Sequence, residues 1–325
     1  MSAHATANAS SRPLRIGLPP AGALLRAASD TIPPTWMVLI GVVSVQMGAG
    51  IAKNLFGVLP PSAVVFLRLA TSAVVLVALA RPVLRGRTRA DWMTAIGFGL
   101  CLALMNYSLY QAIARIPMGI AVTIEFLGPL AVAVAGSRRR VDLVWVALAG
   151  CGVLLLGRSD GDITFAGVAF ALLAGAAWAG YILLSAATGR RFSGTSGLAI
   201  ASVVGVLVMA PAGIAEGGTA LLDPRLLVIG TAVGLLSSVV PYTLEMQALR
   251  RMPPRVFGIL MSLEPTAAAL IGLALLGEVL SVWQWLAVGC VVGASVGATR
   301  TPPPRPAPGA TQLPDTPAAE SGSER

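Results

Sequence analysis

Two glutamates of this chain lie inside apolar segments, and each stands shortly before a proline. Glu125 precedes Pro129, and Glu264 is followed directly by Pro265. An ionisable side chain in a lipid-embedded helix is energetically expensive, so it is a candidate for function by default. Burial favours the protonated carboxyl group unless a cation lies beside it, which suits reversible proton binding. The two acids therefore predict a site that exchanges protons within the membrane.

Arg68 is the one cation left within an apolar segment, and it is the candidate partner of these acids. The alternative is a structural Glu–Arg pair that holds two helices together. Further polar and aromatic side chains in the apolar segments could shape the same site, or serve only packing and interhelical hydrogen bonds. They are Gln46, Asn106, Tyr107, Tyr110, Trp178, Tyr181, Tyr242, Glu245 and Gln247.

Pro129 and Pro265 predict kinks in the helices that carry the acids. A proline inside a helix cannot donate to the carbonyl four residues earlier, so these two free the carbonyls of Glu125 and Met261. In transporters such carbonyls commonly line a polar cavity. A kink with only a structural role is the alternative.

The composition places these residues in a membrane. Apolar residues make up 56% of the 325 residues, charged residues only 11%, and the mean hydropathy is +0.80. A soluble domain has about 25% charged residues. The net charge of +9 does not indicate a nucleic-acid partner, because the cations punctuate apolar runs instead of clustering with polar and aromatic residues.

Ten apolar spans are predicted, each near the roughly 20 residues that a helix needs to cross a bilayer. The chain is therefore expected to be an all-α membrane protein with ten transmembrane helices. The spans are Trp36–Gly50, Ser62–Ala80, Trp92–Ala112, Met118–Ser137, Val141–Gly157, Ile163–Ala186, Ser196–Ile214, Leu226–Leu249, Val256–Leu276 and Val282–Ala298.

The cations predict the orientation of these spans. With the N-terminus in the cytoplasm, 18 of the 23 basic residues fall on the cytoplasmic side, and only Lys53, Arg115, Arg158 and Arg225 fall on the other. The positive-inside rule then favours both termini in the cytoplasm. Lys53, near the outer end of the first span, is interpreted as an interfacial residue. Residues 1–35 and 300–325 are too poor in apolar residues to fold alone and are predicted to be disordered tails.

An internal repeat divides the spans into two halves, residues 36–158 and 159–299. Six residues recur 136 positions further along the chain: Gln111, Ala112, Arg115, Pro117, Pro129 and Gly136. The offset spans five helices, and an odd number reverses the direction of the chain, so the two halves should be inverted copies. Secondary transporters use this plan and bind substrate near the midplane between the halves. Under this offset the prolines coincide, whereas Glu125 and Glu264 are displaced by three residues and share a helix face.

The sequence lacks the residues that the common types of enzyme catalysis need. The single lysine follows Ala52 and cannot belong to a nucleotide-binding P-loop, and the only histidine, His4, lies in the N-terminal tail. Cys101, Cys151 and Cys290 are scattered and lack metal-ligand spacing. We therefore expect no cofactor, no metal site and no catalytic residue, with a membrane-embedded enzyme as a remote alternative.

Several segments carry distinctive residue patterns: Gly50–Lys53 with Leu55 and Phe56, Met105–Tyr107, Pro117–Ala133, Pro241–Met246, Phe257–Pro265 and Gly277–Glu278. They resemble the EamA-type transporters of the drug/metabolite transporter superfamily, and among them the RhtA-type threonine/homoserine exporters of bacterial inner membranes. The resemblance covers residues 36–299.

The resemblance implies a multi-pass exporter of small amino acids in the bacterial inner membrane, exchanging its substrate for protons by alternating access. A zwitterionic substrate suits the candidate residues, since its ammonium group could meet Glu125 or Glu264. Its carboxylate could meet Arg68 or the donors Asn106 and Tyr107. The same fold exporting a drug or another metabolite is the main alternative, and the oligomeric state has no signal in the sequence.

Overall fold

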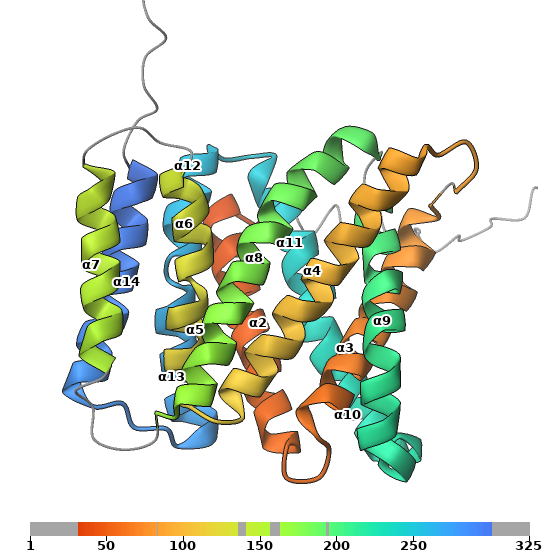
Figure 1. Cartoon of the computed structure of the whole chain (residues 1–325), viewed down its shortest axis with the longest axis horizontal. Coiled ribbons are helices and arrows are strands. Elements are labelled where there is room, and N and C mark those ends of the chain that lie inside the picture. The colour runs from red at the N-terminus through yellow and green to blue at the C-terminus, as the bar shows by residue number, and fades with distance from the viewer. Residues whose placement is uncertain (1–31, 83, 136–140, 157–162, 193–194, 301–325) are drawn as a thin grey trace, which may run out of the picture.

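The computed structural model describes residues 32–82, 84–135, 141–156, 163–192 and 195–300. Within these ranges every regular element is a helix (Figure 1). The first half contains α2 (Pro34–Leu55), α3 (Pro61–Ala80), α4 (Arg89–Ile113), α5 (Met118–Glu125), α6 (Leu127–Ala135) and α7 (Asp142–Leu156). The second contains α8 (Phe165–Arg191), α9 (Ser196–Gly217), η1 (Gly218–Leu222), α10 (Pro224–Gly234), η2 (Leu235–Val239), α11 (Val240–Leu249), α12 (Pro254–Met261), α13 (Glu264–Leu276) and α14 (Val282–Arg300).

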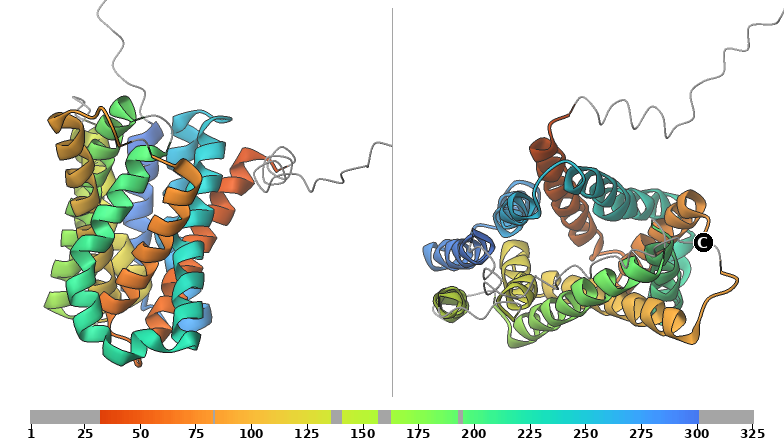
Figure 2. Two further views of the ribbon diagram at one scale, coloured as in Figure 1. Left: turned by 90° about the vertical axis from the view of Figure 1, so that its right-hand side faces the viewer. Right: turned by 90° about the horizontal axis from the view of Figure 1, so that it is seen from above.

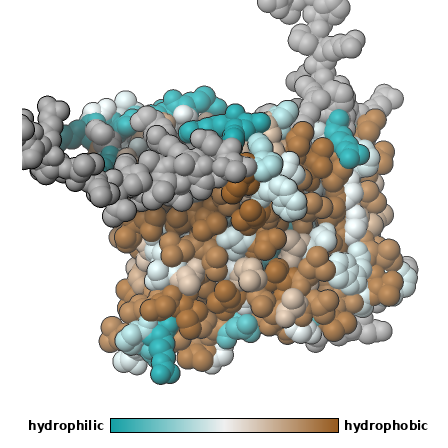
Figure 3. All heavy atoms as spheres, turned by 180° about the vertical axis from the view of Figure 1, so that it is seen from behind, coloured by the Kyte–Doolittle hydropathy of each residue, from teal (hydrophilic) through white to brown (hydrophobic). Residues whose placement is uncertain are grey.

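The helices have the lengths and surfaces of a membrane protein. In the described ranges, nine helical stretches are long and apolar enough to span a bilayer, and α7 is an apolar helix of 15 residues. Fifteen residues rise by about 22 Å, which is less than a bilayer core. Apolar side chains cover most of one face between more hydrophilic ends (Figure 3). The prediction of an all-α membrane protein is confirmed. Of the ten predicted spans, nine are long enough to cross the bilayer in the described ranges, and the fifth is this shorter helix.

Three predicted spans are interrupted helices. The fourth is divided into α5 and α6, the eighth into α10, η2 and α11, and the ninth into α12 and α13. The first span is longer than the limits Trp36–Gly50, because α2 continues to Leu55. Ser137 and Gly157, the predicted ends of the fourth and fifth spans, and nearly all of the two tails lie outside the described residues.

The helices pack in pairs that join the two halves of the chain. Helix α4 lies along α8, α3 lies along α9, and α7 lies along α14, while α2 contacts α11 and α13 (Figures 1 and 2). Exchanging each helix of these pairs for its counterpart in the other half gives a pair that is also in contact. For example, the contact of α4 with α8 corresponds to that of α11 with α2.

The ends of corresponding helices also recur at the offset of 136 residues. Helix α5 covers Met118–Glu125, and α12 covers Pro254–Met261, which is the same interval shifted by 136. Helix α2 ends at Leu55 and α8 ends at Arg191, and these two end positions also differ by 136 residues. The interruption at Phe126 therefore falls at the position equivalent to Ser262.

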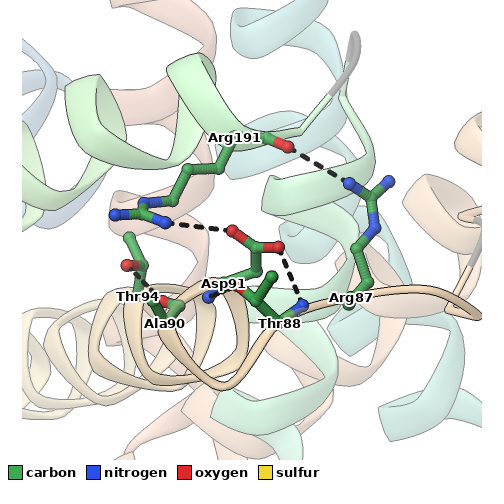
Figure 4. A network of polar contacts seen from close by, with 6 residues as sticks. All are labelled: Arg87, Thr88, Ala90, Asp91, Thr94 and Arg191. Carbon is green, nitrogen blue, oxygen red and sulfur yellow. Dashed lines mark hydrogen bonds and ion pairs between the residues drawn. The ribbon is translucent and has the colours of Figure 1, made fainter.

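Polar contacts join the start of α4 to the end of α8 (Figure 4). Thr88 and Asp91 form a capping box at the start of α4. Arg191, at the end of α8, donates to the Asp91 carboxylate at 3.1 Å, and Arg87 donates to the Arg191 carbonyl at 3.1 Å. These contacts fix the α4–α8 pair at this end.

The α5–α6 interruption is pressed against α8 through two glycines. A Cβ added at Gly128 would lie 2.0 Å from the Gly175 carbonyl oxygen, and one added at Gly175 would lie 2.8 Å from the Glu125 carbonyl oxygen. Real Cβ atoms do not approach backbone oxygens this closely. The two glycines thus permit a backbone contact that places Glu125 beside α8.

We expect Gly128→Ala to destabilise the protein by about 1–3 kcal/mol, because α6 or α8 must move to admit the methyl group. Thermal unfolding of the purified protein, followed by size-exclusion chromatography after heating, would show a lower Tm. Gly150→Ala is the matched control, since Gly150 is an exposed helical glycine with nothing near its Cβ position. An equal Tm for Gly128→Ala and wild type would contradict the assigned contact.

Candidate functional site

A cavity of about 340 Å³ lies inside the bundle and collects most of the predicted site residues. Helices α2, α3, α4, α5, α8, α11 and α13 each contribute at least one of these side chains. Nine of the ten predicted binding residues line the cavity: Gln46, Arg68, Asn106, Glu125, Trp178, Tyr181, Tyr242, Glu245 and Glu264. Residues more than 200 positions apart in the sequence thus meet in one place.

Tyr107 and Pro265 are not among the lining residues. Tyr107 follows Asn106 on α4, so its side chain leaves the helix in a different direction from that of Asn106. Its ring packs edge-on against Phe170, with the ring centroids 6.3 Å apart. Pro265 is buried in the first turn of α13, a position that needs no N–H donor. Pro129 does line the cavity, three residues after the interruption at Phe126.

Glu264 begins α13 directly after the interruption and is almost fully buried, with 6% of its surface exposed. Its Oε1 accepts a hydrogen bond from Gln46 Nε2 of α2 at 3.3 Å. Glu264 Oε2 and Gln46 Oε1 are both buried without a hydrogen-bond partner. Two acceptor atoms therefore face the cavity unsatisfied, which is a setting that receives a proton or a donor from a ligand.

Glu125 and Glu245 bring two further carboxyl groups to the cavity. Glu125 ends α5 and is buried, and Glu245 of α11 reaches α2, where a Cβ added at Gly41 would lie 3.6 Å from its Oε1. The Glu245 carboxyl group therefore lies against the backbone of α2 at Gly41. Carboxylates gathered in a small, poorly hydrated space repel one another. Protons or a positively charged substrate group would relieve that repulsion.

Arg68 extends from α3 into the cavity wall, where it is held by partners other than glutamate. Its Nη2 donates to the Ser237 carbonyl at 3.1 Å, its Nη1 to the Tyr110 hydroxyl at 3.3 Å, and its Nε to Ser238 Oγ at 3.5 Å. Among the described residues, no carboxylate lies within ion-pair distance of Arg68. The predicted direct pair between Arg68 and a glutamate is therefore absent from this conformation.

Pro241 explains why the Ser237 carbonyl is available to Arg68. Pro241 has no N–H to donate to the carbonyl four residues earlier, and residues Leu235–Val239 form a turn of π-helix. A second carbonyl of this turn, that of Leu236, accepts from Ser44 Oγ of α2 at 2.7 Å. The interruption before α11 thus creates acceptors that side chains of the first half satisfy.

Asn106 and Ser237 add two more unsatisfied atoms to the cavity. Asn106 Nδ2 donates to the Leu102 carbonyl of its own helix at 2.7 Å, whereas Asn106 Oδ1 is buried without a partner. Ser237 Oγ is also buried without a partner. Together with Gln46 Oε1 and Glu264 Oε2, four such atoms belong to lining residues. Buried polar atoms are normally paired, so this concentration marks the cavity as a binding site.

Aromatic rings form one wall of the cavity. Trp178 of α8 packs edge-on against Phe126, the residue at the α5–α6 interruption, with ring centroids 5.4 Å apart. Tyr181, also of α8, stacks at a tilt on Phe98, with ring centroids 4.9 Å apart. These contacts hold the rings of α8 at the cavity.

The cavity extends toward one end of the bundle. Its lining includes Phe257 of α12, Thr299 near the end of α14 and the exposed Ala133 near the end of α6. Helices α12 and α6 lie toward the upper side of Figure 1. In the opposite direction the lining among the described residues stops at Ala49 of α2 and Leu109 of α4. Beyond it Leu59, Ile113, Ile116 and Met118 are fully buried. Apolar packing therefore closes the lower end.

Sequence reasoning missed two features of this arrangement. The interpretation of Lys53 as an interfacial residue is incomplete, because its ammonium group forms an ion pair with Glu278. The link from Arg68 to Ser237 was also missed. A signal for that link exists, since Pro241 within a span identifies Ser237 as the residue whose carbonyl needs another donor.

Comparisons with known proteins relate the chain to transporters. Residues 165–300 match the EamA-like transporter family. The threonine/homoserine exporter RhtA of Escherichia coli K12 is 42% identical over 275 residues, which cover 82% of this chain and 93% of that protein. The Salmonella typhimurium LT2 exporter of the same name is 41% identical with the same coverage. One solved crystal structure, 21% identical, superposes with a TM-score of 0.57 over 81% of this chain and 96% of that one, which shows a similar fold.

Proposed function

This chain belongs to the EamA-like transporter family, and from that membership we propose that it exports threonine, homoserine and similar small amino acids through the central cavity. The protein is a multi-pass protein of the bacterial inner membrane. A relative named as an exporter matches 82% of the chain at 42% identity. We propose protons as the coupling ion.

The observation that carries the proposal is the combination of unsatisfied polar atoms and charges in one buried cavity. Three carboxyl groups, one guanidinium group and four polar atoms without a partner, one of which belongs to the Glu264 carboxyl group, line about 340 Å³. Pockets for small molecules begin at about 300 Å³. A small amino acid fits this volume and carries groups of both signs, which these residues complement.

The structure refines how a zwitterion would bind. The ammonium group donates to Glu264 Oε2 and Gln46 Oε1, both of which are buried acceptors without partners. Asn106 offers Oδ1, an acceptor, because its amide nitrogen already donates to Leu102. Asn106 therefore suits the substrate hydroxyl group, and Arg68 is the cation that attracts the carboxylate. Tyr107, which lies outside the lining, has no direct role in this arrangement.

The transport mechanism that we propose is alternating access between two inverted five-helix repeats, residues 36–158 and 159–299. Equal offsets between helix ends and the exchange symmetry of the helix pairs support this division. The positive-inside rule supports termini in the cytoplasm, which makes the open end of the cavity the cytoplasmic one. A glutamate then carries a proton inward in one step and releases it to admit the substrate ammonium group in the next.

Substrate analogues test the proposed cargo. We expect unlabelled threonine and homoserine to compete with radiolabelled homoserine for binding to the purified protein. Threoninol, which lacks the carboxylate, and N-acetylthreonine, which lacks the ammonium group, should bind about 30-fold or more weakly, because each leaves a buried charge unpaired. Competition by unrelated drugs or metabolites with equal potency, and none by threonine, would favour a different cargo for the same fold.

A further inference from the structure

An ion pair closes the end of the bundle that lies opposite the open end of the cavity. Lys53 Nζ, near the end of α2, lies 2.5 Å from Glu278 Oε1, in the turn between α13 and α14. Lys53 also donates to the Ile116 carbonyl at 3.0 Å. The other carboxylate oxygen of Glu278 accepts from the Met118 backbone N–H at the start of α5, at 2.7 Å. Two charged side chains thus join α2, α5 and α13.

The turn before α14 is shaped to hold the Glu278 carboxylate inward. Gly277 adopts a left-handed conformation with φ 68°, and the Glu278 N–H donates to the Gly272 carbonyl at 3.1 Å. A Cβ added at Gly272 would lie 2.7 Å from Glu278 Oε2. Glycine at positions 272 and 277 therefore lets the carboxylate fold back over α13 instead of extending into the surrounding medium.

The ion pair crosses the boundary between the halves of the chain. Lys53 and Met118 belong to the first half, and Glu278 belongs to the second. The side chains of Lys53 and Glu278 keep only 22% and 15% of their surface exposed, so water screens their attraction incompletely. The side chains of Ile116 and Met118, whose backbone groups bond to the pair, are buried. Separation of the halves at this end would have to break the pair first.

We propose that Lys53 and Glu278 form the gate that keeps the cavity closed on the outer side and that must open for release of substrate. This inference rests on the orientation and the function proposed above. The contacts are polar and few, and they join the ends of helices that belong to different halves. Such a contact stabilises the closed end and still breaks when the halves rock apart.

Thiol labelling from outside the cell tests the gate. In a background with the three native cysteines replaced by alanine, Ala49→Cys places a reporter on the cavity wall between Gln46 and Lys53. We expect Lys53→Met and Glu278→Gln to increase the labelling rate by a membrane-impermeant maleimide by roughly tenfold, because each removes a charge-assisted contact of the closed state. Lys53→Arg retains the charge and should label at nearly the parent rate.

Asp91→Asn is the matched control, since it breaks the ion pair between Arg191 and Asp91 at the opposite end of the bundle and should leave outside labelling unchanged. Labelling from the cytoplasmic side in inverted vesicles, at the rate of the parent, shows that each variant keeps the parent structure at its open end. The gate is overturned if Lys53→Met and Glu278→Gln are both labelled from outside at the parent rate. It is also overturned if Lys53→Arg is labelled as fast as Lys53→Met. Homoserine efflux, measured separately, tests the proposed function, so the two can fail independently.

Discussion

Export driven by a pH gradient is expected to disappear when Glu264 or Glu125 is replaced by glutamine. Glutamine has nearly the size of glutamate and can still accept a hydrogen bond from Gln46 at position 264, so insertion and packing should be retained. It can neither carry a proton nor pair with an ammonium group. Loss of a buried charged partner weakens an interaction by about 2–5 kcal/mol, which corresponds to about 30-fold or more.

Homoserine efflux from reconstituted vesicles, with and without an imposed pH gradient, measures this effect. Glu216→Gln is the matched control, because Glu216 is an exposed acid at the end of α9, bonded to Ser62 and away from the cavity. The control should respond to the gradient as wild type does. If Glu264→Gln and Glu125→Gln both keep a wild-type response to the gradient, neither acid couples transport to protons.

The second large effect is expected for Arg68→Ala. The substitution removes the one cation that lines the cavity among the described residues, and it leaves the Ser237 carbonyl without its donor. We expect the Kd for homoserine to rise by about 30-fold, because the substrate carboxylate loses its counter-charge. We also expect a lower Tm, since an unsatisfied buried carbonyl destabilises by about 1–3 kcal/mol.

Tyr110→Phe separates the two roles of Arg68. Tyr110 accepts from Arg68 and does not line the cavity, so its replacement removes one hydrogen bond and keeps the charge. We expect a small decrease in Tm and an unchanged Kd, measured by thermal unfolding and by calorimetric titration of the purified protein. If Arg68→Ala lowers the Tm but binds homoserine as wild type does, Arg68 supports the fold and takes no part in recognition.

The two halves contribute unequally to the cavity. Under the offset of 136, Asn106 corresponds to Tyr242, and both line the cavity, but Arg68 corresponds to Val204 and Glu245 to Leu109. Helix ends recur at this offset, whereas the charged side chains do not. An asymmetric substrate with one positive and one negative end requires this difference, because identical halves would present identical charges.

Much of the architecture is readable from the sequence, because the features that specify it are local. Continuous apolar runs require helices that satisfy their own backbone groups in lipid, and this predicts an all-α membrane protein. Glycine, proline and charge mark the ends of those helices. The repeat offset of 136 predicts which interruptions correspond, and the ends of α5 and α12 differ by that offset. Acids inside apolar helices lie where a polar cavity makes their burial tolerable.

Only the tertiary structure decided which polar groups meet. Tyr107 and Asn106 are neighbours in sequence, but the rotation of α4 turns one toward Phe170 and the other into the cavity. Arg68 meets a carbonyl freed by Pro241 instead of a glutamate, and Lys53 meets Glu278, which lies 225 positions away. The sequence determines where each helix can exist because backbone and lipid chemistry act locally. Partner choice depends on helix rotation and on which faces pack, and these are settled jointly by all the helices.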